Sequence, residues 1–372
     1  MAIDTPAGID SEEGMDLGAQ HGDPDDPRRI WRPSTAGYVG RFFVLGLFAA
    51  FVLTAPFWVP DTQTNILSRA AVFAMVALSM NVLMGYTGQV SLGHAAFVGV
   101  GAFSAGFALT EAQMPWMFAA VFAIATGGVS ALILGGIALR VRGLYLALVT
   151  IAYGLFAQEV IFNIRAVTRG GAGMPAPRPA FASGDYAYFY LCVAAVLVVW
   201  VLDWLLTSSK AGRAIQALRD DERVAASWGI NVTGFKLLAF VVSGSIAGLA
   251  GALFASIETI VVSISFGFGL SLLFVLMTVV GGLGSRPGVV TGGVLFAVLP
   301  TLLETAHNAW SWWPFTALWE PLIGALLLIL TLIFFPGGIA QQNEHLYRWL
   351  SFKKFHAEEH GPVANPGGGG GH

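Results

Sequence analysis

Long apolar stretches recur along this chain and are separated by short polar loops. Each approaches the roughly 20 residues that an α-helix needs to cross a bilayer. Only 11% of the residues are charged, against about 25% in soluble globular proteins, so the chain cannot cover itself with a water-compatible surface. We count about ten stretches, near 41–59, 66–85, 93–110, 116–138, 143–163, 186–206, 235–256, 268–283, 288–306 and 319–335.

These stretches predict a polytopic, all-α transmembrane bundle. Backbone polar groups in hydrocarbon must be satisfied within the protein, which restricts spanning segments to helices and closed barrels. The alternation of apolar and polar residues that marks barrel strands does not occur here. Three stretches are short or interrupted by glycine, so we expect eight to ten spans. Around this transmembrane domain (39–340), residues 1–38 are predicted to be a disordered acidic tail, and 341–372 a second tail that ends in a linker-like "GGGGGH".

The distribution of lysine and arginine predicts the orientation. Cytoplasmic loops carry an excess of these residues. If the N-terminus is cytoplasmic, 15 of the 19 fall inside, and the four outside are Arg69, Arg165, Arg169 and Arg178. With an even number of spans, both termini are therefore expected on the cytoplasmic side.

A polar segment, "KAGRAIQALRDDERVAASWGINVTGFK" at 210–236, interrupts the apolar pattern. Its five consecutive charges at 219–223 would cost over about 10 kcal/mol in hydrocarbon, so the segment must lie in water. It is nevertheless helix-prone, with Ser208 or Ser209 as a cap and Gly229 at its end. A largely apolar stripe, broken by Asp221, fits a groove on another protein, but a solvated connector or an interfacial helix are alternatives. The stripe comprises Ala214, Ala217, Leu218, Val224, Ala225 and Trp228.

Five spaced blocks of sequence resemble one protein family. They are "NVLMGYTGQVSLGHAAFVGVGAF" (81–103), "RGLYLALVTIAYG" (142–154), "TRGGAGMP" (168–175), the run 208–255 and "GGLGSRPGVVTGGV" (281–294). In this order they resemble permease subunits of ABC importers for branched-chain amino acids, of the high-affinity leucine/isoleucine/valine type. The resemblance covers about residues 65–340, and it is closer to the LivM-type subunit than to its LivH-type partner.

The resemblance implies a transport subunit of the bacterial inner membrane, driven by two separate ABC ATPase subunits. It also implies a second, LivH-type permease and a periplasmic solute-binding protein as partners. Residues 210–230, within the cytoplasmic loop 207–234, would form the helix that couples to an ATPase. The expected contacts are Arg213, Asp220, Glu222, Ala225 and Gly229. The family's Glu-Ala-Ala motif reads Arg223-Val224-Ala225 here, which weakens the case for an acidic contact at that position.

The chain is not expected to be an enzyme. It lacks the Gly-x4-Gly-Lys-Ser/Thr loop of ATPases, and we expect no catalytic residue, cofactor, metal or nucleic-acid partner. An ion-coupled secondary transporter is a less favoured alternative, because such proteins usually embed ionisable residues at mid-membrane. Within the family, permeases for urea or short-chain amides look alike, so a branched-chain or related hydrophobic amino acid remains an expectation.

A glycine-interrupted segment, "GYTGQVSLGHAAFVGVGAF" at 85–103, is the candidate translocation path. Polar residues beside a broken helix are typical of transport paths. We expect Gly88, Gln89, Ser91 and His94 to line the path or its gate, although close helix packing is an alternative for the glycines.

Three further features have open interpretations. The loop at 168–179 could contact the solute-binding protein or be a bare connector. Arg286 is placed to meet anionic headgroups or a partner. Gly244, Gly248 and Gly251 predict tight helix packing, with a permease–permease seam as one location.

Overall fold

A computed structural model describes residues 46–47, 50, 52–57, 63–139, 143–169, 172–309, 316–334 and 337–342. All of them belong to one compact unit, residues 46–347. The expected tail at 1–38 lies outside the described residues, and so does the expected tail at 341–372 except for its first two residues, which belong to α14. The long helices are α2 (Thr64–Met80), α3 (His94–Thr110), α4 (Trp116–Ala138), α5 (Leu144–Glu159), α7 (Asp185–Ser208), α10 (Val232–Glu258), α11 (Phe268–Gly281), α12 (Arg286–Ala309) and α13 (Glu320–Phe334).

Short elements connect these helices. They are the π-helical turn η2 (Asn81–Gly85), η3 (Ile161–Asn163), α6 (Arg165–Thr168), β1 (Met174–Pro175), η5 (Ala180–Ala182), α8 (Lys210–Asp220), α9 (Glu222–Ser227), β2 (Ile260–Val261), η6 (Ser263–Phe266), η7 (Ala317–Trp319) and α14 (Gly338–Gln342).

The prediction of an all-α polytopic membrane protein is confirmed. Within the described residues, a helix lies in nine of the ten expected spans, and only 41–59 falls largely outside them. Seven helices in the described part of the chain are long and apolar enough to cross a membrane. The apolar helices α3 and α13 are shorter, at 17 and 15 residues.

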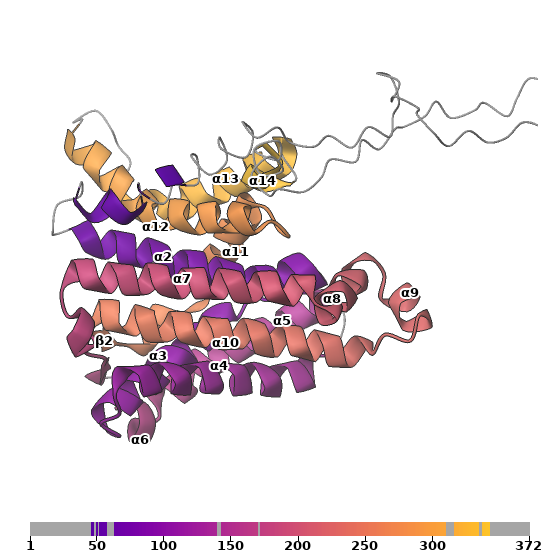
Figure 1. Cartoon of the computed structure of the whole chain (residues 1–372), viewed down its shortest axis with the longest axis horizontal. Helices are drawn as coiled ribbons and strands as arrows, with labels where there is room; N and C mark the ends of the chain where they lie inside the picture. The colour runs from indigo at the N-terminus through magenta and orange to yellow at the C-terminus, as the bar shows by residue number, and fades with distance from the viewer. Residues whose placement is uncertain are drawn as a thin grey trace, which may run out of the picture. The chain divides into compact units, whose positions relative to one another are not determined.

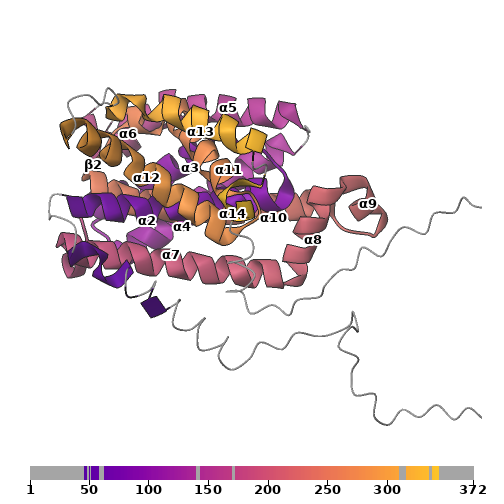
Figure 2. The same cartoon turned by 90° about the horizontal axis from the view of Figure 1, so that it is seen from above.

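Helix α2 lies at the centre of the bundle, between α7 and α12 (Figures 1 and 2). In its most apolar window, 83% of the residues are buried, against 22% in α7. Helix α10 packs against α3 and α4 on another side. A helix buried all round needs apolar residues on every face, which explains why the 66–85 stretch has almost no polar side.

Small residues bring α10 into close contact with α3 and α4. A Cβ atom at Gly248 would lie 2.2 Å from the Ala123 carbonyl oxygen, and one at Gly251 would lie 2.0 Å from the Val98 carbonyl oxygen. A Cβ at Gly244 would meet Ala131 at 2.3 Å. The prediction of tight packing is confirmed for these three glycines. The seam suggested for them is wrong, because their close contacts lie within this chain.

We expect Gly248→Ala to destabilise the bundle by about 1–3 kcal/mol, since overpacking forces backbone shifts. Gly136→Ala in α4 is the matched control, because a Cβ there meets nothing within 4 Å. The measurement is the denaturation midpoint of the purified protein in detergent. Equal midpoints for the two variants would contradict the packing argument.

The connections of the bundle gather at two opposite ends. One, the α8 end, carries α8, α9, the turn at 282–285 and α14, whereas the β1 end carries α6, β1 and β2 (Figure 1). Three arginines expected outside form ion pairs at the β1 end: Arg69 with Glu258, Arg169 with Glu111, and Arg178 with Asp185. Lys210, Arg213, Arg219, Arg223 and Arg286 lie at the α8 end. This separation supports the proposed orientation, with the α8 end in the cytoplasm.

The loop at 168–179 is more ordered than a bare connector. Residues Met174 and Pro175 pair antiparallel with Val261 and Ile260. Met174 and Ala176 are completely buried. The loop therefore contributes to the core at the β1 end, which its polar composition did not predict.

Candidate functional site

Residues 209–230, here called the coupling segment, form two short helices. The Ser209 hydroxyl accepts a hydrogen bond from the Gly212 amide (3.1 Å), which confirms the expected cap on α8. The chain then turns at Asp221, whose extended backbone ends α8. The Asp221 carboxylate accepts from the amides of Arg223 (2.7 Å) and Val224 (3.2 Å), so it caps α9. The prediction of a single continuous helix is therefore wrong, because the segment forms two helices that meet at Asp221.

Gly229 ends α9 as predicted. Its φ of +78° lies in the left-handed region that favours glycine. The Gly229 amide donates to the Ala226 carbonyl (3.0 Å) and the Ile230 amide to the Ala225 carbonyl (3.2 Å). This is the Schellman arrangement that commonly ends helices.

A groove of about 310 Å³ lies between α8 and α9. Its walls are mostly apolar, and Trp228 is 81% exposed beside it. Two carboxylates lie at the groove. The lining residues are Ala217, Asp220, Asp221, Val224, Ala225, Trp228 and Ile230. The expected apolar stripe is thus divided over two helices that enclose a hollow.

The five expected ATPase contacts occupy different environments. Arg213, Asp220 and Gly229 are exposed. Ala225 is only 3% exposed. Glu222 pairs with Lys236 at the start of α10, which holds α9 against the bundle. Arg213, Asp220 and Gly229 are therefore available to a partner, whereas Glu222 and Ala225 are placed to position the segment.

Arg219 connects the coupling segment to the bundle. Its Nη1 donates to the carbonyl oxygen of Gly85, at the end of η2, at 2.6 Å. A Cβ atom at Gly284 would lie 3.0 Å from the same Nη1, and one at Gly88 would lie 3.7 Å from the Arg219 Cγ. One side chain of α8 thus contacts the end of η2 and adjoins the turn before α12.

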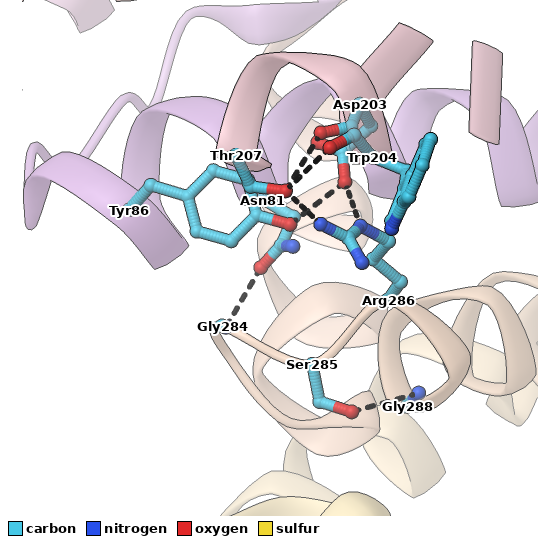
Figure 3. Close-up of polar contacts among 9 residues, drawn as sticks. All are labelled: Asn81, Tyr86, Asp203, Trp204, Thr207, Gly284, Ser285, Arg286 and Gly288. Carbon is cyan, nitrogen blue, oxygen red and sulfur yellow. Dashed lines mark hydrogen bonds and ion pairs between the residues drawn. The ribbon is translucent and has the colours of Figure 1, made fainter. Parts of the chain in front are cut away.

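The π-helical turn η2 is packed against that same turn. The Asn81 Oδ1 accepts a hydrogen bond from the Gly284 amide at 2.7 Å (Figure 3). A Cβ atom at Gly85 would lie 2.0 Å from Asn81 Oδ1, so only glycine fits there. Such π-turns inside helices occur frequently at functional sites.

A buried ion pair joins α7 and α12 at the α8 end, and Tyr86, directly after η2, is hydrogen-bonded to it. Asp203, whose side chain is fully buried, pairs with Arg286 and accepts a hydrogen bond from the Tyr86 hydroxyl at 2.9 Å (Figure 3). Arg286 also donates to the Thr207 hydroxyl. One role expected for Arg286 was binding to lipid headgroups. The structure instead pairs its guanidinium with Asp203 of the same chain.

Residues 88–93, here called the re-entrant segment, turn back into the bundle after α2. Gly88, with φ +69°, ends the helix, and its amide donates to the Met84 carbonyl at 3.2 Å. The Leu92 amide then reaches the Thr150 hydroxyl of α5 at 3.0 Å. A Cβ atom at Gly93 would lie 1.9 Å from the Thr150 carbonyl oxygen. The expected break in the apolar stretch is therefore present and is not helical.

Helix α3 begins inside the bundle at His94. The Ser79 hydroxyl donates to the Ser243 carbonyl (2.6 Å), so it accepts from His94 Nε2 at 2.9 Å. Ser79 lies in α2, before η2 begins, so its contact with His94 places the start of α3 inside the bundle rather than at its end. This internal start explains why α3 has only 17 residues.

The polar residues predicted for the path are buried and incompletely hydrogen-bonded. Gln89 is 5% exposed, and Ser91 and His94 are completely buried. Both polar side-chain atoms of Gln89, the Ser91 hydroxyl and His94 Nδ1 lack a hydrogen-bond partner in the described part of the chain. Because an unpaired buried polar group costs about 1–3 kcal/mol, this cluster is unusual outside a functional site. Gly88, by contrast, is exposed.

Sequence reasoning missed the contacts that join these parts. Arg219 and Gly85 are 134 residues apart, and Arg286 and Asp203 are 83 apart. The sequence showed Arg219 as an arginine in a polar loop, and Asp203 and Arg286 as charges near the ends of spans, but it did not show which residues they contact. Among the residues that the structure describes, no group of three or more His, Cys, Asp or Glu could hold a metal ion.

Comparison with known proteins places the chain in one family. A family model described as "Branched-chain amino acid transport system / permease component" matches residues 62–331. The chain is 30% identical to the high-affinity branched-chain amino acid transport system permease protein LivM of Salmonella typhimurium, over 80% of this chain and 74% of that one. It is 23% identical to LivH of the same organism, over 75% of this chain and 94% of that one.

Among solved structures, the chain is similar to PsaBC from Streptococcus pneumoniae in complex with a Fab. That likeness covers 80% of this chain and 99% of the other, with a TM-score of 0.42 and 12% identity.

Proposed function

Because the chain belongs to the permease family of the branched-chain amino acid transport system, we propose that it moves branched-chain or related hydrophobic amino acids. It is a multi-pass membrane permease subunit of an ABC importer. The proposed substrate rests on the relatives LivM and LivH, both of which are permease proteins of high-affinity branched-chain amino acid transport systems. We place it in the bacterial inner membrane, with both termini in the cytoplasm.

In this proposal, two ABC ATPase subunits bind at the α8 end and supply the energy for transport. A second, LivH-type permease and a periplasmic solute-binding protein complete the importer. The exposed residues Arg213, Asp220 and Gly229 and the groove beside Trp228 form the ATPase contact. An apolar groove with charges at its rim suits a protein partner, because apolar contacts supply affinity and charges select the partner.

The hydrogen bond from Arg219 to Gly85 is the observation that carries this proposal. It connects the segment that meets the ATPase to the residues immediately before the re-entrant segment. When the ATPases close on ATP, α8 and α9 move with them, and Arg219 transmits the displacement to 85–94. The bundle then exchanges between outward-open and inward-open states, which is a population shift between two packings.

The path runs past Gly88, Gln89, Ser91 and His94 in this proposal. The unpartnered polar atoms of the last three residues hydrogen-bond the ammonium and carboxylate groups of the amino acid in transit. High affinity is unnecessary in the permease itself, because the solute-binding protein collects the solute.

The test is uptake by proteoliposomes that contain this chain, its encoded second permease, both ATPases and the binding protein. We expect ATP-dependent leucine uptake that is lost when the sequence of 212–228 is scrambled. Urea and acetamide, offered as competing solutes, distinguish the related permease classes. Uptake by this chain alone under an ion gradient without nucleotide would contradict the proposal.

A further inference from the structure

An arginine and a glutamate from two otherwise apolar helices form an exposed ion pair at the β1 end. Arg69 is the only charged residue of α2, and Glu258 is the last residue of α10. The Arg69 Nη2 pairs with the Glu258 Oε1, and the two side chains are 44% and 34% exposed. An exposed ion pair contributes little to stability, whereas charged residues in transmembrane helices are costly and commonly functional. The fold alone therefore gives little reason for this pair.

A shallow depression lies beside the ion pair. Glu258 lines it together with Phe254 and Phe266, whose ring centres are 6.0 Å apart. The guanidinium carbon of Arg69 lies 5.9 Å from the centre of the Phe254 ring, so Arg69 adjoins the same depression. The other lining residues are Ile260 and Val261 of β2 and Ser265 of η6 (Figure 1). A positive group, a negative group and an aromatic surface thus meet at one place.

This set of groups matches a zwitterionic amino acid with an apolar side chain. The guanidinium of an arginine donates paired hydrogen bonds to a carboxylate, and the carboxylate of a glutamate accepts hydrogen bonds from an ammonium group. An apolar side chain gains free energy when it leaves water for an apolar surface such as the Phe254 ring. The depression therefore offers a partner to each part of such a solute.

The aromatic rings of the depression also reach toward the candidate path. Phe266 packs against Phe162, with 5.9 Å between the ring centres. A Cβ atom at Gly99 would lie 2.4 Å from Phe162 Cζ and 3.0 Å from Phe266 Cγ, so both rings rest on α3 at Gly99. Gly99 lies about 7.5 Å along the helix axis from His94, and α3 then continues to its contact with β1. These rings therefore lie on the β1 side of His94.

We propose that this depression is the site at which the amino acid enters the permease, with its carboxylate on Arg69 and its ammonium group on Glu258. The inference rests on the proposed function, which supplies the solute and places the β1 end in the periplasm. The charges of the solute replace the contact between the two side chains, and its apolar side chain lies against Phe254. The rings of Phe254 and Phe266 close the site toward the path and separate before the solute reaches residues 88–94.

Uptake by the complete importer in proteoliposomes tests this inference. Glu258→Gln and Arg69→Gln each remove one charge and keep a polar side chain. Glu111→Gln is the matched control, because Glu111 also pairs with an arginine at the β1 end and its side chain is 43% exposed. Leucine uptake is measured over a range of binding-protein concentrations, and the denaturation midpoint of each variant is measured in detergent.

We expect the maximal uptake rate to fall about tenfold or more in Glu258→Gln and in Arg69→Gln, since each loses a hydrogen bond to a charged group of the solute. The half-saturating concentration of binding protein and the denaturation midpoint should stay near the parent values. All three quantities should stay near the parent values in Glu111→Gln.

Maximal rates at the parent level in both variants, or an equal loss in Glu111→Gln, would overturn the site. A higher half-saturating concentration with an unchanged maximal rate would instead assign the pair to docking of the binding protein. A loss of uptake that accompanies a lower midpoint would assign it a structural role. If the parent importer takes up no leucine, the proposed function fails instead, and the two failures are therefore distinguishable.

Discussion

Arg219→Ala is expected to uncouple ATP hydrolysis from solute uptake. The change removes the hydrogen bond from Nη1 to the Gly85 carbonyl (2.6 Å) and leaves the rest of α8 in place. A hydrogen bond from a charged group contributes about 1.5–3 kcal/mol, and 1.4 kcal/mol is a tenfold change in an equilibrium. Uptake per ATP hydrolysed should therefore fall about tenfold or more in proteoliposomes that contain the whole importer.

Lys210→Ala is the matched control for this variant. Lys210 carries the same charge at the exposed start of the same helix, so its loss should leave uptake per ATP close to normal. Copurification of the ATPases with Arg219→Ala shows that docking survives. If uptake and hydrolysis fall in parallel, or if the control behaves like Arg219→Ala, then Arg219 does not transmit the motion.

The spans could be predicted because the bilayer imposes a simple requirement. A segment surrounded by hydrocarbon or by other apolar helices must itself be apolar for about 20 residues, and this pattern is readable without knowing any neighbour. The helix caps could also be predicted, because the hydrogen bonds that form them are local. Ser209 and Gly229 act on amides and carbonyls within a few residues of themselves.

Contacts between residues that are distant in the sequence could not be predicted from local sequence patterns. Asp203 and Arg286 were each recognisable as charges near span ends, but nothing local indicates that they pair with each other. The division of the coupling segment at Asp221 had a local signal, since aspartate is a preferred N-cap residue. That signal competes with the helix-favouring alanines on both sides, and the structure shows that the cap prevails.

In the candidate translocation path, one feature could be predicted from the local sequence and another could not. The residue types in 88–94 predict a polar interruption, and this was correct because glycine and polar residues are costly inside a transmembrane helix. The depth of His94 depends on its hydrogen bond with Ser79, and the level of Leu92 depends on Thr150 of α5. Neither partner is close in the sequence, so the re-entrant course of the segment required the structure.

Asp203→Ala is expected to cause the largest loss of stability among single changes at the α8 end. Its carboxylate is fully buried and neutralises Arg286, whose side chain is 23% exposed. Removing one partner of a buried pair leaves an uncompensated charge and costs about 3–5 kcal/mol. The Tyr86 hydroxyl loses its acceptor at the same time. The denaturation midpoint of the purified protein in detergent measures the effect.

Glu111→Ala provides the matched comparison, because it breaks the ion pair with Arg169, in which the two side chains are 43% and 46% exposed. Exposed pairs contribute only about 0–1 kcal/mol, so this variant should denature near the parent midpoint. The double variant Asp203→Leu with Arg286→Met removes both buried charges, and it should be more stable than Asp203→Ala. If the double variant is the less stable of the two, or if Asp203→Ala matches Glu111→Ala, the pair does not hold α7 and α12 together as we infer.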